Sequence, residues 1–265
     1  MAFGSRGRGN LVLGVPREAF RPSGLFLSIL ALFVVSGVML WTRFGSLKLD
    51  VILFVISGWV ISLCLHEYAH ALTAYRAGDL GVAQRGYLTL NPMKYTHPLL
   101  SIVLPLVFVI LGGFGLPGGA VWIDHHYIRN KVHDTLISLA GPATNVFLAL
   151  VTIAPFWFVN DPLGHLEFYA ALAFLAFLQL TASVLNLFPI PGVDGGNALR
   201  PWIPYEWRRG FDFIAPWGML AFILLLFNPV LNNAFFGLVY AIGDGLGLPR
   251  DLSAIGGDLF RFLSL

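Results

Sequence analysis

Two histidines and a glutamate lie within five positions of one apolar stretch. The run H-E-Y-A-H at residues 66–70 fits the pattern H-E-x-x-H. On a helix, residues four apart share one face, so His66 and His70 can bind one metal ion together. Zinc accepts imidazole nitrogen readily, and a catalytic zinc keeps one position open for a water that Glu67 could deprotonate. This spacing predicts a zinc centre that activates water.

The surroundings of this motif separate it from a chance match. Residues 51–65 contain no charged side chain, and three ionisable groups then follow within five positions. Buried polar groups without partners are costly, and ionisable residues at membrane depth mark function by default. At about 1.5 Å per residue, His66 lies deep within a helix over residues 51–77. We therefore expect the metal inside the bilayer, closer to the C-terminal end of that helix.

The composition is that of an integral membrane protein. The 265 residues are 57% hydrophobic and only 11% charged, and the mean hydropathy is +0.77. The net charge of +2 is small and scattered, which argues against nucleic-acid binding. The single cysteine, Cys64, cannot form an internal disulfide, and we expect it to pack on another face of the helix than His66. The N-terminal tail is too long and polar for a cleavable signal peptide.

The apolar pattern predicts an all-α polytopic membrane protein with about six transmembrane helices. These are expected at residues 24–42, 51–77, 135–159, 165–188, 211–227 and 230–242. Residues 1–23 are expected to form a cytoplasmic basic tail, residues 24–243 the transmembrane domain, and residues 244–265 a C-terminal surface tail. Alternating residues predict short β-strands at 84–90 and 120–123.

The fifteen apolar residues 99–113 could cross the membrane or re-enter it. The basic tail assigns the N-terminus to the cytoplasm, although Arg43 and Lys48 then fall outside. If residues 99–113 re-enter, all basic residues around Arg129 and Arg208 stay inside, and the outer turn at 160–164 carries none. We therefore expect re-entry. This assignment places the C-terminal ends of the helices over 51–77 and 165–188 on the same side.

That shared side matters because a catalytic zinc needs a third protein ligand. In the run N-L-F-P-I-P-G-V-D-G-G at residues 186–196, two prolines break the helix and three glycines allow close approach. Broken backbone at membrane depth is tolerated only where it lines protein or a water-filled cavity. Asp194 could then complete a His₂Asp site. Taken alone, however, the run is better explained as the surface end of a helix with a solvated Asp194.

Together the two motifs resemble the site-2 protease family of intramembrane zinc metalloproteases, in its short prokaryotic form. The resemblance rests on H-E-x-x-H, on N-x-x-P-x-P-x-x-D-G from residue 186, and on G-P-x-x-N at residues 141–145. It covers the core at residues 50–200. It implies one zinc ion per chain held by His66, His70 and Asp194, with Glu67 as the general base. Asn186 would bind the substrate backbone, and Asn145 would support or contact the site.

The resemblance further implies a zinc-dependent endopeptidase that cleaves membrane-anchored proteins within the lipid bilayer of a prokaryotic cell membrane. The strand-like stretches near Leu88 and Val121 could offer an edge to an unfolded substrate segment. A metal transporter is one alternative, but it would favour several ligand sites along a path. An inactive scaffold is another, but it would usually lack a ligand or the base. His125 and His126 stay open as accessory metal contacts, although loop histidines are more readily explained as solvated.

Overall fold

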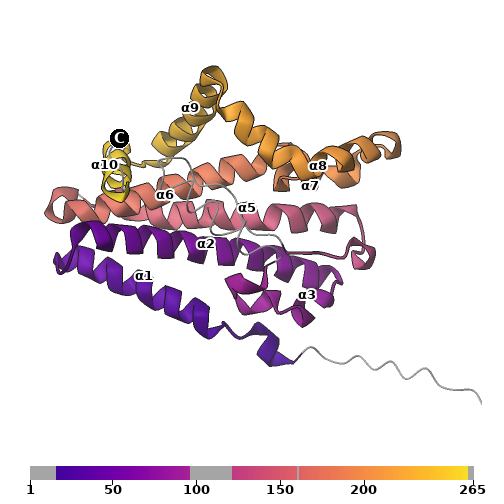
Figure 1. Ribbon diagram of the computed structural model, residues 1–265, viewed down its shortest axis with the longest axis horizontal. Coiled ribbons are helices and arrows are strands. Elements are labelled where there is room, and N and C mark those ends of the chain that lie inside the picture. Colours follow the sequence, from indigo (N-terminus) through magenta and orange to yellow (C-terminus); the bar gives the residue numbers. More distant parts are fainter. Residues whose placement is uncertain (1–15, 96–120, 160, 262–265) are drawn as a thin grey trace, which may run out of the picture.

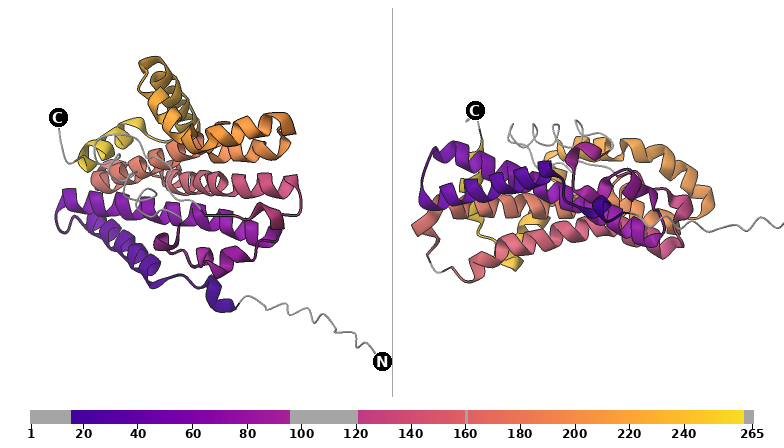
Figure 2. Two further views of the ribbon diagram at one scale, coloured as in Figure 1. Left: turned by 45° about the vertical axis from the view of Figure 1, so that its right-hand side comes forward. Right: turned by 90° about the horizontal axis from the view of Figure 1, so that it is seen from below.

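A bundle of four long helices forms the frame of the protein. The computed structural model describes residues 16–95, 121–159 and 161–261. Helix α1 packs on α2, α2 on α5 and α5 on α6 (Figure 1), and the two further directions of view in Figure 2 show the same neighbours. The four helices span Gly24–Thr42 (α1), Leu47–Ala77 (α2), Lys131–Ile153 (α5) and Leu166–Leu187 (α6).

Three further helices complete the C-terminal part. Helices α8 and α9 form an inverted V above α6 in Figure 1. Helix α10 returns to α6, where the ring of Phe260 lies 5.6 Å from that of Phe174, so that its apolar face is buried. These helices span Tyr205–Leu226 (α8), Pro229–Leu246 (α9) and Arg250–Phe260 (α10).

Short helical turns connect the long helices. Two of them are α-helical and the others are 3-10 turns. They are α3 (Gly81–Gln84), α7 (Asp194–Leu199), η1 (Arg17–Phe20), η2 (Tyr87–Thr89), η3 (Pro92–Lys94), η5 (His125–Tyr127), η6 (Ala154–Trp157), η7 (Pro162–His165) and η8 (Arg200–Trp202).

Local sequence signals explain where the first helices begin and end. The Ser23 hydroxyl accepts the Phe26 N–H at 3.1 Å, which caps α1. Arg43 ends the helix in a left-handed conformation with φ of 55°, so both predicted limits of this helix are confirmed. Helix α2 begins at Leu47, four residues before the predicted start at residue 51. The prediction began too late because the first turn of α2 carries the charged residues Lys48 and Asp50. The apolar pattern marks the membrane-crossing part of a helix and misses such a charged first turn.

Among the described residues, five helices are long and apolar enough to cross a membrane, in agreement with the predicted class. The sixth predicted span, residues 230–242, is helical within α9 but is not one of the five. Much of α2 and α6 is buried inside the bundle, whereas α1 and α8 expose most of their apolar surface, which suits contact with lipid. The predicted re-entrant segment, residues 99–113, lies outside the described residues.

The predicted strands are not found in the described part of the chain. Residues 84–90 form the end of α3 and the turn η2, so the prediction of a strand there was wrong. The chain turns because Gly86 and Leu90 both adopt left-handed backbone conformations, with φ of 77° and 56°. Tyr87 and Leu88, which are consecutive, are both buried between them, so burial in this stretch does not alternate as it would in a half-buried strand. Residues 121–123 form no regular element.

Polar contacts tie the helix ends together in two groups. At one end, Asp79 beyond α2 accepts the Asp124 N–H at 2.8 Å, and the Thr135 hydroxyl on α5 donates to the Ala198 carbonyl on α7 at 2.8 Å. At the other end, the Nδ1–H of His165 donates to the Trp41 carbonyl at 2.9 Å. The C-terminal end of α2 therefore lies beside the start of α5 and the start of α8 (Figure 1).

This arrangement predicts which exposed positions share a side of the membrane. In a Cys64→Ala background, a membrane-impermeant thiol reagent should label the variants Tyr127→Cys and Tyr205→Cys from one side of the membrane and Leu163→Cys from the other, because Leu163 lies at the opposite end of the bundle. With the predicted cytoplasmic N-terminus, positions 127 and 205 should react only after the cells are opened. All three positions are exposed. Labelling of positions 127 and 205 from opposite sides would contradict this arrangement, and the Cys64→Ala parent provides the unlabelled control.

Candidate metal centre

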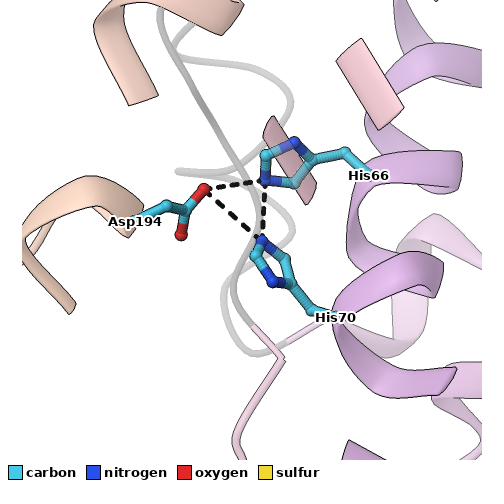
Figure 3. Close-up of side chains that lie close together, drawn as sticks. All are labelled: His66, His70 and Asp194. Atoms are coloured by element: carbon cyan, nitrogen blue, oxygen red, sulfur yellow. Dashed lines mark hydrogen bonds and ion pairs between the residues drawn. The ribbon is translucent and has the colours of Figure 1, made fainter. Parts of the chain in front are cut away.

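His66, His70 and Asp194, the three predicted metal ligands, lie close together and could hold one metal ion. Figure 3 shows the two imidazoles and the carboxylate facing one another. The Nε2 atoms lie 3.0 Å apart, and Asp194 Oδ2 lies 3.1 Å from that of His66 and 3.4 Å from that of His70. A tetrahedral zinc with ligands at 2.0–2.1 Å has ligand atoms about 3.3 Å apart. The donor set and its spacing therefore fit a zinc ion with one open position.

Helix α2 presents the two histidines from successive turns. The Nδ1–H of His70 donates to the carbonyl oxygen of Ile137 on α5 at 2.6 Å. This bond fixes the tautomer, so that the lone pair of Nε2 points toward the other two ligands. His66 is also buried, and its Nδ1 has no hydrogen-bond partner among the described residues.

The break after α6 carries Asp194 to the histidines. Helix α6 ends at Leu187, and the chain turns through Gly192, whose φ of 86° suits a residue without a side chain. Asp194 then opens the short helix α7. The Trp202 indole N–H donates to the Thr135 hydroxyl at 2.8 Å, and that hydroxyl itself bonds to α7. These bonds hold the third ligand against α5, so Asp194 is not the solvated end of a surface helix.

Gly141 brings the backbone of α5 directly over the metal ligands. A Cβ atom built on Gly141 would lie 2.2 Å from Nε2 of His70 and 2.5 Å from that of His66. A methyl group at this position would therefore collide with both ring nitrogens, the atoms that would bind the metal, and would leave no room for zinc between them. The adjacent Pro142 interrupts the hydrogen-bond ladder of α5 at the same point. The G-P pair of the G-P-x-x-N motif therefore lies against the ligands.

Glu67 lies beside the ligands and is almost fully buried. Its Oε2 accepts the backbone N–H of Val121 at 3.1 Å, which fixes the direction of the carboxylate. Glu67 and all three ligands line one cavity of about 670 Å³. Asn186 is buried and lines the same cavity, where a substrate backbone could reach it. Asn145 is buried on α5 one turn beyond Gly141, but it is not among the residues that line the cavity.

The other candidate side chains lie apart from the ligands. His125 lines the outer part of the cavity and its Nδ1 bonds to Asp134 at 2.8 Å, whereas His126 is exposed and does not line it. Cys64 is fully buried, and its backbone carbonyl accepts the Tyr95 hydroxyl at 3.1 Å. Its thiol does not belong to the ligand group.

Several groups around the centre were not found from the sequence. Two are backbone groups, the Ile137 carbonyl and the Val121 amide, and residue type gives no signal for them. A third is the exposed ion pair of Arg200 with Asp212 at 2.6 Å on the cavity wall. Arg200 lies in η8 and Asp212 in α8, and their opposite charges were the only signal in the sequence for this ion pair.

Relatives of the chain are named as zinc metalloproteases. Over 255 residues it is 46% identical to "Putative zinc metalloprotease Rip2" of Mycolicibacterium smegmatis, covering 94% of this chain and 96% of that protein. The protein of the same name from Mycobacterium tuberculosis is 46% identical over 253 residues, with 94% and 97% covered. "Putative zinc metalloprotease YwhC" of Bacillus subtilis is 26% identical over 212 residues, with 77% and 94% covered. No protein-family model and no solved structure matches the chain.

A His₂Asp centre beside a buried glutamate, within a bundle of long apolar helices, is the arrangement of a membrane-protein zinc metalloprotease. The mycobacterial relatives are named as zinc metalloproteases and match nearly the whole chain. The protein belongs to the site-2 protease-like family of zinc metalloproteases.

The ligand geometry predicts one tightly bound zinc ion per chain. Elemental analysis of protein purified without chelator should give a zinc-to-protein ratio of about one. Three protein ligands hold one zinc ion and leave its fourth coordination position for water. His66→Ala or His70→Ala should remove the zinc. His125→Ala should retain it, since His125 bonds to Asp134 and not to the ligands. Full zinc content in His70→Ala would contradict the assignment.

The packing of α5 predicts that a single methyl group displaces the metal. Gly141→Ala should lose nearly all zinc, because the added carbon would fall within about 0.5 Å of the ordinary zinc–nitrogen distance from both histidines. The matched control is Gly237→Ala in α9, where an added Cβ meets nothing within 4 Å. Zinc and circular dichroism should be measured for both variants. A helical Gly141→Ala protein with full zinc would show that α5 does not close over the ligands.

Proposed function

We propose that the protein is a zinc-dependent intramembrane endopeptidase that hydrolyses peptide bonds in or near transmembrane segments of membrane-anchored proteins. The observation that carries this proposal is that Glu67 lines the same cavity as the three metal ligands, on a helix long and apolar enough to cross a membrane. Metal-assisted hydrolysis needs a metal site, a base and room for a peptide in one place, and the ligand group, Glu67 and the volume of this cavity support these three roles.

Each residue has a distinct part in the reaction. His66, His70 and Asp194 would hold zinc, which supplies a Lewis acid that makes water acidic and polarises a carbonyl. The Glu67 carboxylate takes the proton of the attacking water and passes it to the leaving amine. The Val121 N–H keeps that carboxylate directed into the cavity. The Asn186 side-chain amide donates a hydrogen bond to the substrate backbone, which orients the scissile bond.

The shape of the cavity supports a reaction that consumes water. Its wall includes Arg200 and Asp212, whose side chains are 37% and 43% exposed, so that it reaches the surface at the end of the bundle where α8 begins. His66 and Glu67 lie at its buried part. Water can therefore enter from that end and meet a peptide bond at membrane depth.

The distribution of basic residues supports a placement in the membrane. Four arginines precede α1, which favours a cytoplasmic N-terminus in a prokaryotic cell membrane. The cavity then opens toward the cytoplasm, because α1 crosses once and α2 returns. Substrates anchored in the same bilayer would present their transmembrane segments to it.

The metal centre favours a protease over a metal transporter. A transport path needs several ligand sites along the membrane normal. In the part of the chain that the structure describes, His66, His70 and Asp194 form one compact group of three such ligands. An inactive scaffold is disfavoured as well, because the three ligands face one another (Figure 3) and Glu67 lines the same cavity.

The Glu67→Gln variant tests the proposal most directly. It should keep its zinc, because the ligands are untouched and the Gln carbonyl can still accept the Val121 N–H. Turnover of a membrane-embedded reporter should fall by ~10²–10⁴-fold, because an amide cannot take the proton of the attacking water. Zinc and cleavage should be measured in the same preparations.

Glu167→Gln on α6 is the matched control. Glu167 pairs with Arg43 at the opposite end of the bundle, at 3.5 Å, so its substitution should leave turnover unchanged. Full cleavage by Glu67→Gln with zinc retained would remove Glu67 from the chemistry. Loss of zinc from Glu67→Gln would instead make Glu67 a ligand or a structural support.

A further inference from the structure

Asp79 is a buried carboxylate that the reaction described above does not use. It follows α2 by two residues and is only 1% exposed. Its Oδ1 accepts the Gly81 N–H at 2.9 Å, and its Oδ2 accepts the Asp124 N–H at 2.8 Å. A buried carboxylate is costly unless it is paired and hydrogen-bonded, so these bonds hold Asp124 firmly against the end of α2.

Arg85 binds the same segment from the neighbouring turn. Its Nη1–H donates to the Trp122 carbonyl at 3.0 Å, and its guanidinium lies 4.4 Å from the centre of the Trp122 ring. Arg85 Nη1 also lies 3.8 Å from Oδ2 of Asp79. Asp79 and Arg85 therefore form one charged pair that binds two backbone groups of residues 122–124.

The segment that this pair holds is the one that contacts Glu67. Residues 121–123 line the cavity, and the Val121 N–H donates to Oε2 of Glu67. Gly78 also packs tightly on the same stretch, since a Cβ atom there would lie 2.5 Å from the Tyr127 carbonyl oxygen. A shift of residues 122–124 would therefore move the donor that directs the Glu67 carboxylate.

We propose that Asp79 and Arg85 are positioning residues, which hold residues 121–124 so that the Val121 N–H orients the Glu67 carboxylate. The proposal rests on the proposed protease function, because the positioning matters only if Glu67 acts as a base. Outer groups that orient reacting side chains commonly change activity by ~10–100-fold when they are removed.

A purely local role for Asp79 explains less of the structure. The end of α2 is already satisfied, because the Gly78 N–H donates to the carbonyls of Ala74 and Tyr75. A turn closed by Asp79 and Gly81 needs only Oδ1. Both partners of Oδ2 instead involve residues 122–124: one is the Asp124 amide, and the other is Arg85, which donates to the Trp122 carbonyl.

The test is Asp79→Asn in the full-length protein in detergent. Asparagine keeps the shape but can accept with one oxygen only, and it loses the charge that attracts Arg85. Zinc content should be unchanged. Amide hydrogen exchange in residues 121–127 should become faster, and kcat per bound zinc should fall about 10-fold or more. Hydrogen exchange needs no substrate, so it reports on the segment even if no cleavage is found.

Two comparisons isolate the effect on Glu67. Asp161→Asn is the matched control, because Asp161 also accepts the N–H of the second residue after it, Leu163, at 3.0 Å, but lies at the other end of the bundle. It should change neither measurement. In a Glu67→Gln background, Asp79→Asn should reduce residual turnover far less than in the wild type, because the base it orients is already absent.

Each outcome decides the proposal. Unchanged exchange in residues 121–127 would show that Asp79 does not hold the segment. Faster exchange with unchanged kcat would show that the segment does not position Glu67, and an equal loss of turnover in the Glu67→Gln background would show the same. If the zinc-loaded wild type cleaves no membrane-embedded reporter, the proposed function fails, and positioning of a base by Asp79 fails with it. The exchange result would then establish only a structural contact.

Discussion

The contact between α5 and the two histidines of α2 is the constraint on which the rest of the site depends. Gly141 places bare backbone within reach of both Nε2 atoms, and the Ile137 carbonyl one turn earlier orients His70. Because the two helices pack this closely, the two histidines, Asp194 and Glu67 can lie together inside an apolar bundle. Nearby polar groups there reduce the cost of burying them. Thr135 at the start of α5 then bonds to α7, so the same helix also places Asp194.

Much of the site could be predicted because its main parts are side chains with recognisable chemistry. His66, His70 and Glu67 share a spacing that has meaning only on a helix, and Asp194 directly follows a Pro- and Gly-containing break between two helices. The limits of α1 were equally predictable, since Ser23 and Arg43 flank a largely apolar run without charged residues. At these positions, residue type and spacing were sufficient to predict the local structure.

The rest depends on tertiary contacts that residue type does not encode. The alternation at residues 84–90 has the pattern of a strand, yet left-handed conformations at Gly86 and Leu90 bend the chain into a compact turn that buries the consecutive residues Tyr87 and Leu88. The donor that directs Glu67 is a backbone amide, as is the group that Asp79 binds. Gly141 belonged to a recognised motif, but its packing against the ligands depends on the contact between α2 and α5, which the sequence does not show. Asn145 lies near this contact, although its part in the reaction is still a prediction.

The position of Asp194 along the chain has a consequence for biosynthesis. Chains are made from the N-terminus, and the third ligand follows the fourth of the five long apolar helices found among the described residues. A nascent chain that has already inserted α2 holds the base and two histidines but lacks a complete ligand set. Assembly of the complete ligand set must wait until α7 has emerged and docked on α5. The late aspartate thus delays the onset of catalytic competence until most of the helical bundle has been synthesised.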